Sequence, residues 1–134
     1  WLRDAPFAGF STVEPWLPVN PAHQSDAVDV QEKDADSCLN LTRRLLAMRR
    51  ANSALRLGSY QTLHVDDHVL AVLRRHEDNS VFIAFNLSDQ TRSVTIPETF
   101  ALIHDLAVTV GEASLKAQKL ELAPWSALLL PVSA

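Results

Sequence analysis

The stretch SCLNLTRRLLAMRRAN, residues 37–52, is the only long helical pattern in the sequence, and it constrains the fold more than any other segment. Apolar side chains recur along it at steps of three and four residues, which places them on one stripe of a helix. The stripe consists of Cys38, Leu41, Leu45 and Met48, widened by Leu39 and Leu46. Because an arc this wide needs cover on more than one side, the pattern predicts that the helix packs against a further surface.

Both ends of this stretch carry signals that stabilise a helix. Asp36 or Ser37 can cap the first turn, because a short side-chain oxygen accepts hydrogen bonds from amide groups without helical partners. Arg49 and Arg50 lie in the last turn, where positive charge suits the negative end of the helix dipole. Cys38 is the only cysteine, so it forms no intrachain disulfide, and its place on the stripe predicts a small buried side chain.

The segment before the helix is punctuated by proline. Four prolines within the first 21 residues oppose both helix and central strand, because each lacks an amide donor and fixes its own φ. The same segment is rich in large apolar side chains, which disordered linkers lack. It therefore reads as an ordered but irregular arm that rests on another surface, followed by a polar surface loop over residues 22–35.

The segment after the helix has the pattern of short strands separated by turns. Residues 53–57 predict one further helical turn, which Gly58 ends in the left-handed conformation. Residues 81–87 are nearly all apolar and predict a central strand covered on both faces. Residues 108–117 predict a loop or hairpin, and Trp125 is expected in the core. The predicted strands are 60–65, 69–75, 81–87, 92–96, 100–106, 119–122 and 125–132.

These patterns together predict the fold class. It is mainly β with one long helix: an antiparallel Greek-key β-sandwich preceded by an irregular proline-rich arm and a helix. The chain opens on Trp1 and its only methionine is Met48, which suggests a piece of a longer protein.

Composition excludes several function classes. A net charge of −4 argues against nucleic-acid binding, which requires a basic surface. No apolar run approaches the roughly 18 residues that a membrane span needs, so no membrane partner is expected. With three glycines, the chain lacks the material for a glycine-rich phosphate loop, and no cofactor is expected.

The candidates for catalysis or metal binding are weak. His64 and His68 flank a turn in the segment HVDDH, which is either a weak metal site or, as we favour, a solvated hairpin tip. The carboxylates cluster in turns, whereas glycosidase chemistry needs two carboxylates that converge on a pocket. No metal site and no catalytic residue is assigned.

The aromatic residues of the arm are better candidates for binding. Trp1, Phe7, Phe10 and Trp16 can stack on a sugar or on another apolar ligand. The alternative, which we favour, is that these side chains pack the arm onto a neighbouring domain.

Several motifs go further than residue chemistry, because they occur in a family-specific order. They are AGFS at 8–11, PWLPVNP at 15–21, QEKDADS at 31–37, LTRRLLAMRR at 41–50, SALRLGSY at 53–60, VFIAFNLS at 81–88 and LAPWSALLL at 122–130. Together they resemble the α-amylase superfamily, glycoside hydrolase family 13, and within it the α-glucosidases and oligo-1,6-glucosidases. Two positions depart from the family pattern: Ala35 replaces a usual proline, and Thr42 replaces a usual aromatic residue.

The resemblance implies a layout in three parts. Residues 1–36 resemble the last barrel loop, residues 37–58 the eighth barrel helix, and residues 59–134 the C-terminal antiparallel β-domain. The family's catalytic carboxylates lie on upstream barrel strands, so none is carried over to this sequence. The implied function is a non-catalytic, stabilising C-terminal module of a cytoplasmic α-glucosidase.

Two alternatives remain open at this stage. In the first alternative, the chain is a carbohydrate-binding module for α-glucosides. In the second, it is a free-standing protein that self-associates. The expected partner is therefore either the barrel domain of a parent enzyme or a second copy in a homodimer. The interface candidates are Leu17, Leu39, Leu41, Leu45, Leu46 and Met48.

Overall fold

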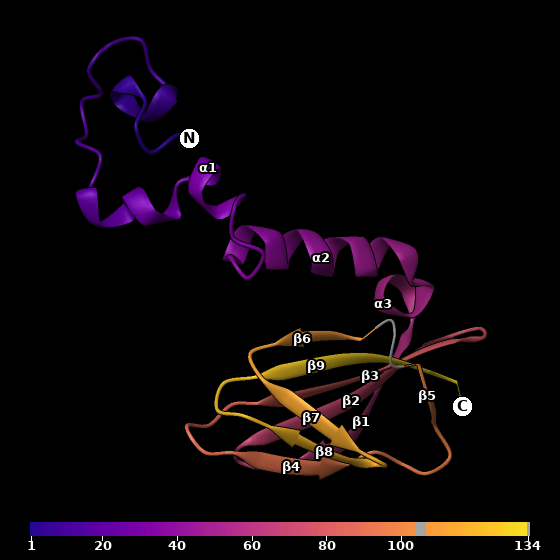
Figure 1. Cartoon of the computed structure of the whole chain (residues 1–134). Helices are drawn as coiled ribbons and strands as arrows, with labels where there is room; N and C mark the ends of the chain where they lie inside the picture. The colour runs from indigo at the N-terminus through magenta and orange to yellow at the C-terminus, as the bar shows by residue number, and fades with distance from the viewer. Residues whose placement is uncertain (104–106, 134) are drawn as a thin grey trace. The chain divides into compact units, whose positions relative to one another are not determined.

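A computed structural model describes residues 1–103 and 107–133 of the chain (Figure 1). The chain divides into two compact units, Trp1–Leu46 and Ala47–Ala134. The predicted strand over residues 100–106 extends into residues 104–106, which lie outside the described residues. Within the described residues, no helix has the length and the apolar character to cross a membrane.

The first unit contains short helices where the sequence suggested only irregular chain. They are the 3₁₀ helices η1 (Pro6–Gly9) and η2 (Pro21–Asp26) and the α-helix α1 (Val28–Gln31). The predicted surface loop over residues 22–35 is therefore wrong in part. Asn20 caps the start of η2, because its side-chain oxygen accepts from the amide of Ala22 at 3.0 Å. Pro21 follows at the first helical position, where proline is favoured.

The long helix α2 spans Cys38–Ala51, within one residue of the predicted bounds at each end. None of its residues is buried. Cys38 is exposed, which corrects the prediction of a buried thiol, because no described part of the first unit covers that side chain. The apolar stripe is real, but apolar spacing alone does not supply the surface that would bury it.

The first turn of α2 is capped by the preceding polar segment. Ser37 is the N-cap, since its hydroxyl accepts from the amide of Asn40 at 3.2 Å. The Gln31 side-chain oxygen accepts from the amide of Leu39 at 2.9 Å. The Asn40 side chain in turn donates to the carbonyls of Gln31 and Asp34, at 2.9 and 2.8 Å. The motif at 31–37 therefore folds as a helix cap.

The second unit begins with the end of α2 and the short helix α3 (Ser53–Leu57). Gly58 follows α3 with φ −65° and ψ 150°, so it is extended and not left-handed as predicted. Glycine is required for a different reason. A β-carbon at this position would stand 2.3 Å from the carbonyl oxygen of Ala54.

Two antiparallel sheets form the rest of the second unit (Figure 1). The larger sheet has the order β1-β2-β3-β9-β5, with β6 also paired to β9, and the smaller has the order β4-β8-β7. The strands are β1 Ser59–Val65, β2 Val69–His76, β3 Asn79–Asn86, β4 Arg92–Thr95, β5 Ala101–Leu102, β6 Val108–Val110, β7 Ala113–Lys116, β8 Lys119–Leu122 and β9 Ala127–Ser133. The mainly β, antiparallel fold with one long helix is thus confirmed.

The hydrophobic core lies on both faces of the larger sheet. Alternate residues of β2 and β3, such as Ala71 and Phe82, join side chains of the smaller sheet in one cluster that fills the sandwich. The intervening residues form a second cluster with α3 and with Met48 of α2. This second cluster contains Ala54, Leu55, Val72, Val81 and Ile83. The prediction that residues 81–87 form a central strand covered on both faces is confirmed.

Two further expectations about this unit are wrong. Residues 108–117 do not form a hairpin, because β6 pairs with β9 in the larger sheet whereas β7 pairs with β8 in the smaller one. Trp125 is not in the core: its side chain is 67% exposed. The strand that was expected to bury it begins only at Ala127, so Trp125 lies on the preceding loop.

Candidate functional site

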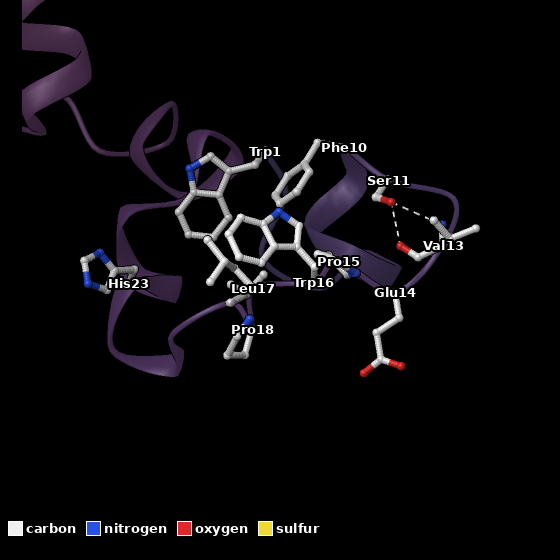
Figure 2. A pocket seen from close by; sticks show the side chains of 11 residues that line it. Trp1, Phe10, Ser11, Val13, Glu14, Pro15, Trp16, Leu17, Pro18 and His23 are labelled. Carbon is white, nitrogen blue, oxygen red and sulfur yellow. Dashed lines mark hydrogen bonds between the residues drawn. The ribbon is translucent and has the colours of Figure 1, made fainter.

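Aromatic residues of the arm gather around one cavity in the first unit, which is called the arm pocket below. Its volume is about 810 Å³, and Figure 2 shows the rings of Trp1, Phe10 and Trp16 close together around it. Three of the four aromatic candidates from the sequence therefore line one pocket. The remaining lining comes from Ser11, Val13, Glu14, Pro15, Leu17, Pro18, Val19 and His23.

The pocket is an open apolar surface. Trp16 is 88% exposed and Phe10 is 63% exposed, whereas Trp1 is half-buried. Phe7 does not line this pocket. It lines an adjacent cavity of about 470 Å³, which also touches Trp1 and Trp16. Such a concentration of exposed aromatic surface is typical of a binding site or of an interface with another chain.

Backbone hydrogen bonds fold the arm so that these rings meet. The amide of Leu2 donates to the carbonyl of Ala8 at 2.9 Å, and the amide of Val28 donates to the carbonyl of Trp1 at 3.1 Å. The chain reverses through three successive left-handed residues, Phe7, Ala8 and Gly9, with φ of 51°, 55° and 73°. Left-handed residues other than glycine are uncommon and carry strain, which often marks functional segments.

Polar groups at the pocket supply hydrogen-bonding capacity that the sequence reasoning missed. Glu14 and His23 also line the pocket; in Figure 2 His23 lies apart from the aromatic rings, and the carboxylate of Glu14 points away from them. The Ser11 hydroxyl is engaged locally, since it donates to the carbonyl of Val13 at 2.5 Å and accepts from the Val13 amide at 3.2 Å. The nearest signal in the sequence is the proximity of Glu14 to Trp16. The set suits a ligand with an apolar face and hydroxyl groups.

The interface candidates are unevenly placed. Leu17 is 58% exposed and Leu46 is 49% exposed. Met48 packs against the second cluster of the second unit, which is called the β-unit below. The other three, Leu39, Leu41 and Leu45, are half-buried. Their role in self-association or in contact with a barrel domain stays a prediction.

Two carboxylates share a groove that the sequence did not single out. Glu112 and Glu121 line a cavity of about 250 Å³ in the β-unit. Both side chains are exposed. A general acid of a glycosidase needs burial that raises its pKa, and this groove does not shield either carboxylate from water.

The HVDDH segment forms the exposed turn between β1 and β2. Asp66 accepts from the amides of His68 and Val69 at 2.8 and 2.7 Å, and its other oxygen lies 3.1 Å from His64 Nε2. These bonds to backbone amides, helped by His64, lower the pKa of Asp66 from 3.8 to about 2. Among the described residues, no group of three or more His, Cys, Asp or Glu side chains is placed to hold a metal ion.

Acid is expected to weaken this turn. Because the folded pKa of Asp66 is lowered, its charge stabilises the fold above the unfolded value of 3.8, and this contribution is lost as pH falls toward about 2. The isosteric change Asp66→Asn should therefore lower the melting temperature at pH 7, with a difference that shrinks between pH 4 and pH 2. Thermal unfolding of both proteins across this range measures the difference. A difference that is constant with pH would contradict the assignment.

Two family models match the chain in succession. Residues 1–58 match the model described as alpha amylase, catalytic domain, and residues 69–129 match the model described as alpha-amylase SusG C-terminal domain. The chain belongs to glycoside hydrolase family 13. It corresponds to the C-terminal region of the enzymes of that family.

Curated relatives of this family-13 chain are glucosidases. A probable alpha-glucosidase of Rhizobium meliloti is 41% identical over 92 residues, which cover 69% of this chain and 17% of the relative. A glucan 1,6-alpha-glucosidase of Streptococcus pneumoniae is 30% identical over 120 residues, which cover 90% of this chain and 22% of the relative. The chain thus spans about a fifth of the length of the curated relatives it matches.

Solved family-13 enzymes share the fold. The trehalulose synthase MutB from Pseudomonas mesoacidophila is 28% identical, with a TM-score of 0.80, over 98% of this chain and 24% of that protein. The alpha-glucosyl transfer enzyme XgtA is 33% identical, with a TM-score of 0.81, over the same shares. The family-13 chain is therefore similar to one segment of these enzymes over nearly its whole length.

Proposed function

We propose that this chain is the non-catalytic C-terminal portion of an α-glucosidase-type enzyme, in which its β-domain stabilises the end of the catalytic domain. One observation carries the proposal. Helix α3 belongs to the segment that matches the catalytic-domain model, and it is buried against strands that match the C-terminal-domain model. The two matched segments thus share one hydrophobic cluster.

The contact has the energy that a stabilising role requires. Ala54 and Leu55 of α3 are 0% and 8% exposed, and they pack on Val72, Val81 and Ile83. Complete burial of a leucine side chain contributes about 1.5–3 kcal/mol. Removal of the β-domain would expose α3 and the face of the sheet that it covers.

The placement of carboxylates supports a non-catalytic role. A retaining glycosidase needs two carboxyl groups about 5 Å apart in a site with one raised pKa. In the described lining of the arm pocket, Glu14 is the one carboxylate. The pair Glu112 and Glu121 is exposed on the β-unit.

Activity assays test the proposal directly. The chain should release no glucose from maltose or isomaltose above the buffer rate. The variants Glu14→Gln, Glu112→Gln and Glu121→Gln serve as controls, because each removes one of the carboxylates that line a cavity. Turnover that falls in any of these variants would refute the non-catalytic role.

A chimera tests the stabilising role. We expect that the Rhizobium meliloti relative, with this chain in place of its matching segment, keeps activity. In that chimera, Leu55→Ser should lower the temperature of inactivation while kcat/KM at low temperature changes little. The exposed Leu57→Ala is the matched control. Equal thermal inactivation of the Leu55→Ser and Leu57→Ala chimeras would contradict the stabilising role.

A second candidate function is sugar binding in the arm pocket, and the convergence of Trp1, Phe10 and Trp16 favours it. Stacking of a sugar ring on an indole should shift the indole N–H resonances of Trp1 and Trp16 when maltose is titrated. Trp16→Ala should abolish the shift of the Trp1 signal, and Phe7→Ala should preserve it, because Phe7 does not line the arm pocket. Signals that do not move at millimolar maltose would exclude this function.

A further inference from the structure

Trp125 is held in an unfavourable backbone conformation at the surface of the β-unit. Its φ is +53°, a left-handed value that is a genuine outlier for a bulky residue. Its side chain is 67% exposed, so burial of the indole does not offset the strain. Strained residues persist where the surrounding structure fixes them, and they cluster at ligand sites.

The surrounding structure does fix the loop that carries Trp125. The Trp125 amide donates to the carbonyl of Ser88 at 3.1 Å. The Ser126 hydroxyl donates to the carbonyl of Ala123 at 2.7 Å, and the buried Asn86 side chain donates to the same carbonyl at 2.8 Å. The indole is therefore presented on a rigid loop that is braced on both sides.

Exposed apolar and polar side chains lie on the two loops that adjoin the Trp125 loop. Leu87 is 57% exposed, and its amide donates to the carbonyl of His68 at 2.7 Å, which joins the loops of residues 66–68 and 87–90. His68, Asp89 and Gln90 are exposed on these two loops. These two loops thus carry exposed apolar surface and groups that donate or accept hydrogen bonds.

We propose that Trp125 is the platform of a surface sugar-binding site on the β-domain, separate from the arm pocket. A rigid indole offers a flat apolar face that covers the C–H face of a pyranose ring, and exposed polar groups of the adjoining loops can hydrogen-bond its hydroxyl groups. The carboxylates of Asp66, Asp67 and Asp89 on the same loops disfavour anionic ligands. That the sugar is an α-glucoside rests on the proposed function.

Indole N–H resonances test the proposal, because the chain has three tryptophans. Each signal is assigned by one Trp→Phe variant, and maltose, isomaltose and β-linked cellobiose are titrated into the full chain. The Trp125 signal should shift saturably with the two α-glucosides. In the variants, binding is followed by the backbone amide signals of Leu87 and Ser126, which do not depend on the indole. Trp125→Ala should weaken this binding by at least about tenfold, whereas Trp16→Ala should leave it unchanged.

A second variant separates binding from stability. Glycine adopts a positive φ without strain, so Trp125→Gly should keep or raise the melting temperature while it abolishes the sugar response. A clear fall in melting temperature would show that the indole has a packing role, and would overturn the proposal. Retained sugar binding in this variant would overturn it too.

Two other outcomes would also overturn it. One is a Trp125 signal that does not move with any sugar at about 50 mM, a concentration that detects even very weak binding. The other is a Trp125 signal that responds only to the catalytic domain of a relative, which would assign the surface to a protein contact. Neither outcome bears on the glucose-release assays, so failure here is distinct from failure of the proposed function.

Discussion

Replacement of Asn86 by alanine is expected to destabilise the β-unit by about 3–5 kcal/mol, one of the largest effects of any polar substitution in the chain. Asn86 is 1% exposed at the end of β3. Its side-chain nitrogen donates to the carbonyls of Gln90, Leu122 and Ala123, at 2.7, 3.1 and 2.8 Å. Alanine would leave these acceptors, one buried and two partly buried, without their donor.

The oxygen of the same side chain completes the network. It accepts from the amide and the hydroxyl of Ser88, at 3.1 and 2.8 Å. Asn86 therefore ties the end of β3 to the turn that follows it and to the end of β8 in the other sheet. Loss of the side chain removes a polar link between the two sheets, and not one isolated bond.

Urea denaturation followed by circular dichroism measures this effect. Asn86→Ala should lower the midpoint without a change in the m-value. The matched control is Asn79→Ala, because Asn79 is exposed at the start of the same strand. Asn86→Asp should be more harmful at pH 7 than at pH 4, because the introduced carboxylate would face three carbonyl oxygens. Equal effects of Asn79→Ala and Asn86→Ala would refute the structural role.

Replacement of Gly58 by alanine is expected to cost about 2–4 kcal/mol, although its backbone conformation suits any residue. The added methyl group would stand 2.3 Å from the carbonyl oxygen of Ala54, which is backbone and does not rotate away. Helix α3 would have to shift. Because Ala54 is fully buried in the second cluster, that shift would disturb packing on the sheet.

The loss of stability expected for Gly58→Ala comes from the clash of the added methyl group, and not from a change in chain flexibility. Leu57→Ala, one residue earlier and 67% exposed, should change the unfolding free energy by less than about 0.5 kcal/mol. If the added methyl group met no clash, Gly58→Ala would tend to stabilise the protein, because alanine lowers the conformational entropy of the unfolded chain. A midpoint of urea unfolding at or above the wild-type value would therefore exclude the steric explanation.

The local periodicity of the sequence predicted much of the fold. The steps of three and four residues in α2 and the alternation in β2 depend on neighbours in the sequence, so both elements lie where the pattern predicted. Pairing between strands is non-local. Nothing in residues 108–117 indicates that β6 and β7 enter different sheets, because that depends on where β8 and β9 lie.

Apolar character proved a weak guide to burial. Cys38 and Trp125 were both expected inside, and both are exposed. A side chain on an apolar pattern is buried only if another surface covers it, and the pattern does not say which surface that is. Sequence context was also a weak guide to backbone conformation at Gly58. It suggested a left-handed helix cap, whereas Gly58 is extended and glycine is needed because a β-carbon would clash with Ala54.

The candidate site was predicted in composition but not in geometry. The arm aromatics were recognisable from the sequence as candidates for binding or for packing on a neighbouring domain. Their convergence depends on the left-handed run through Phe7, Ala8 and Gly9. The sequence does not indicate this run, because two of its three residues are not glycine. Phe7 lines the adjacent cavity, which it shares with Trp1 and Trp16, and Phe10 lines only the first.

The bonding of Asn86 has a practical consequence for producing the protein. Asn86-Leu87-Ser88 has the form of an N-glycosylation signal, and attachment occurs on the nitrogen that here makes three internal hydrogen bonds. A glycan added to the nascent chain in a eukaryotic secretory host would occupy that nitrogen before the sheets could close around it. Expression hosts without this modification should therefore give the folded β-unit, and secretory hosts should give material that fails quality control.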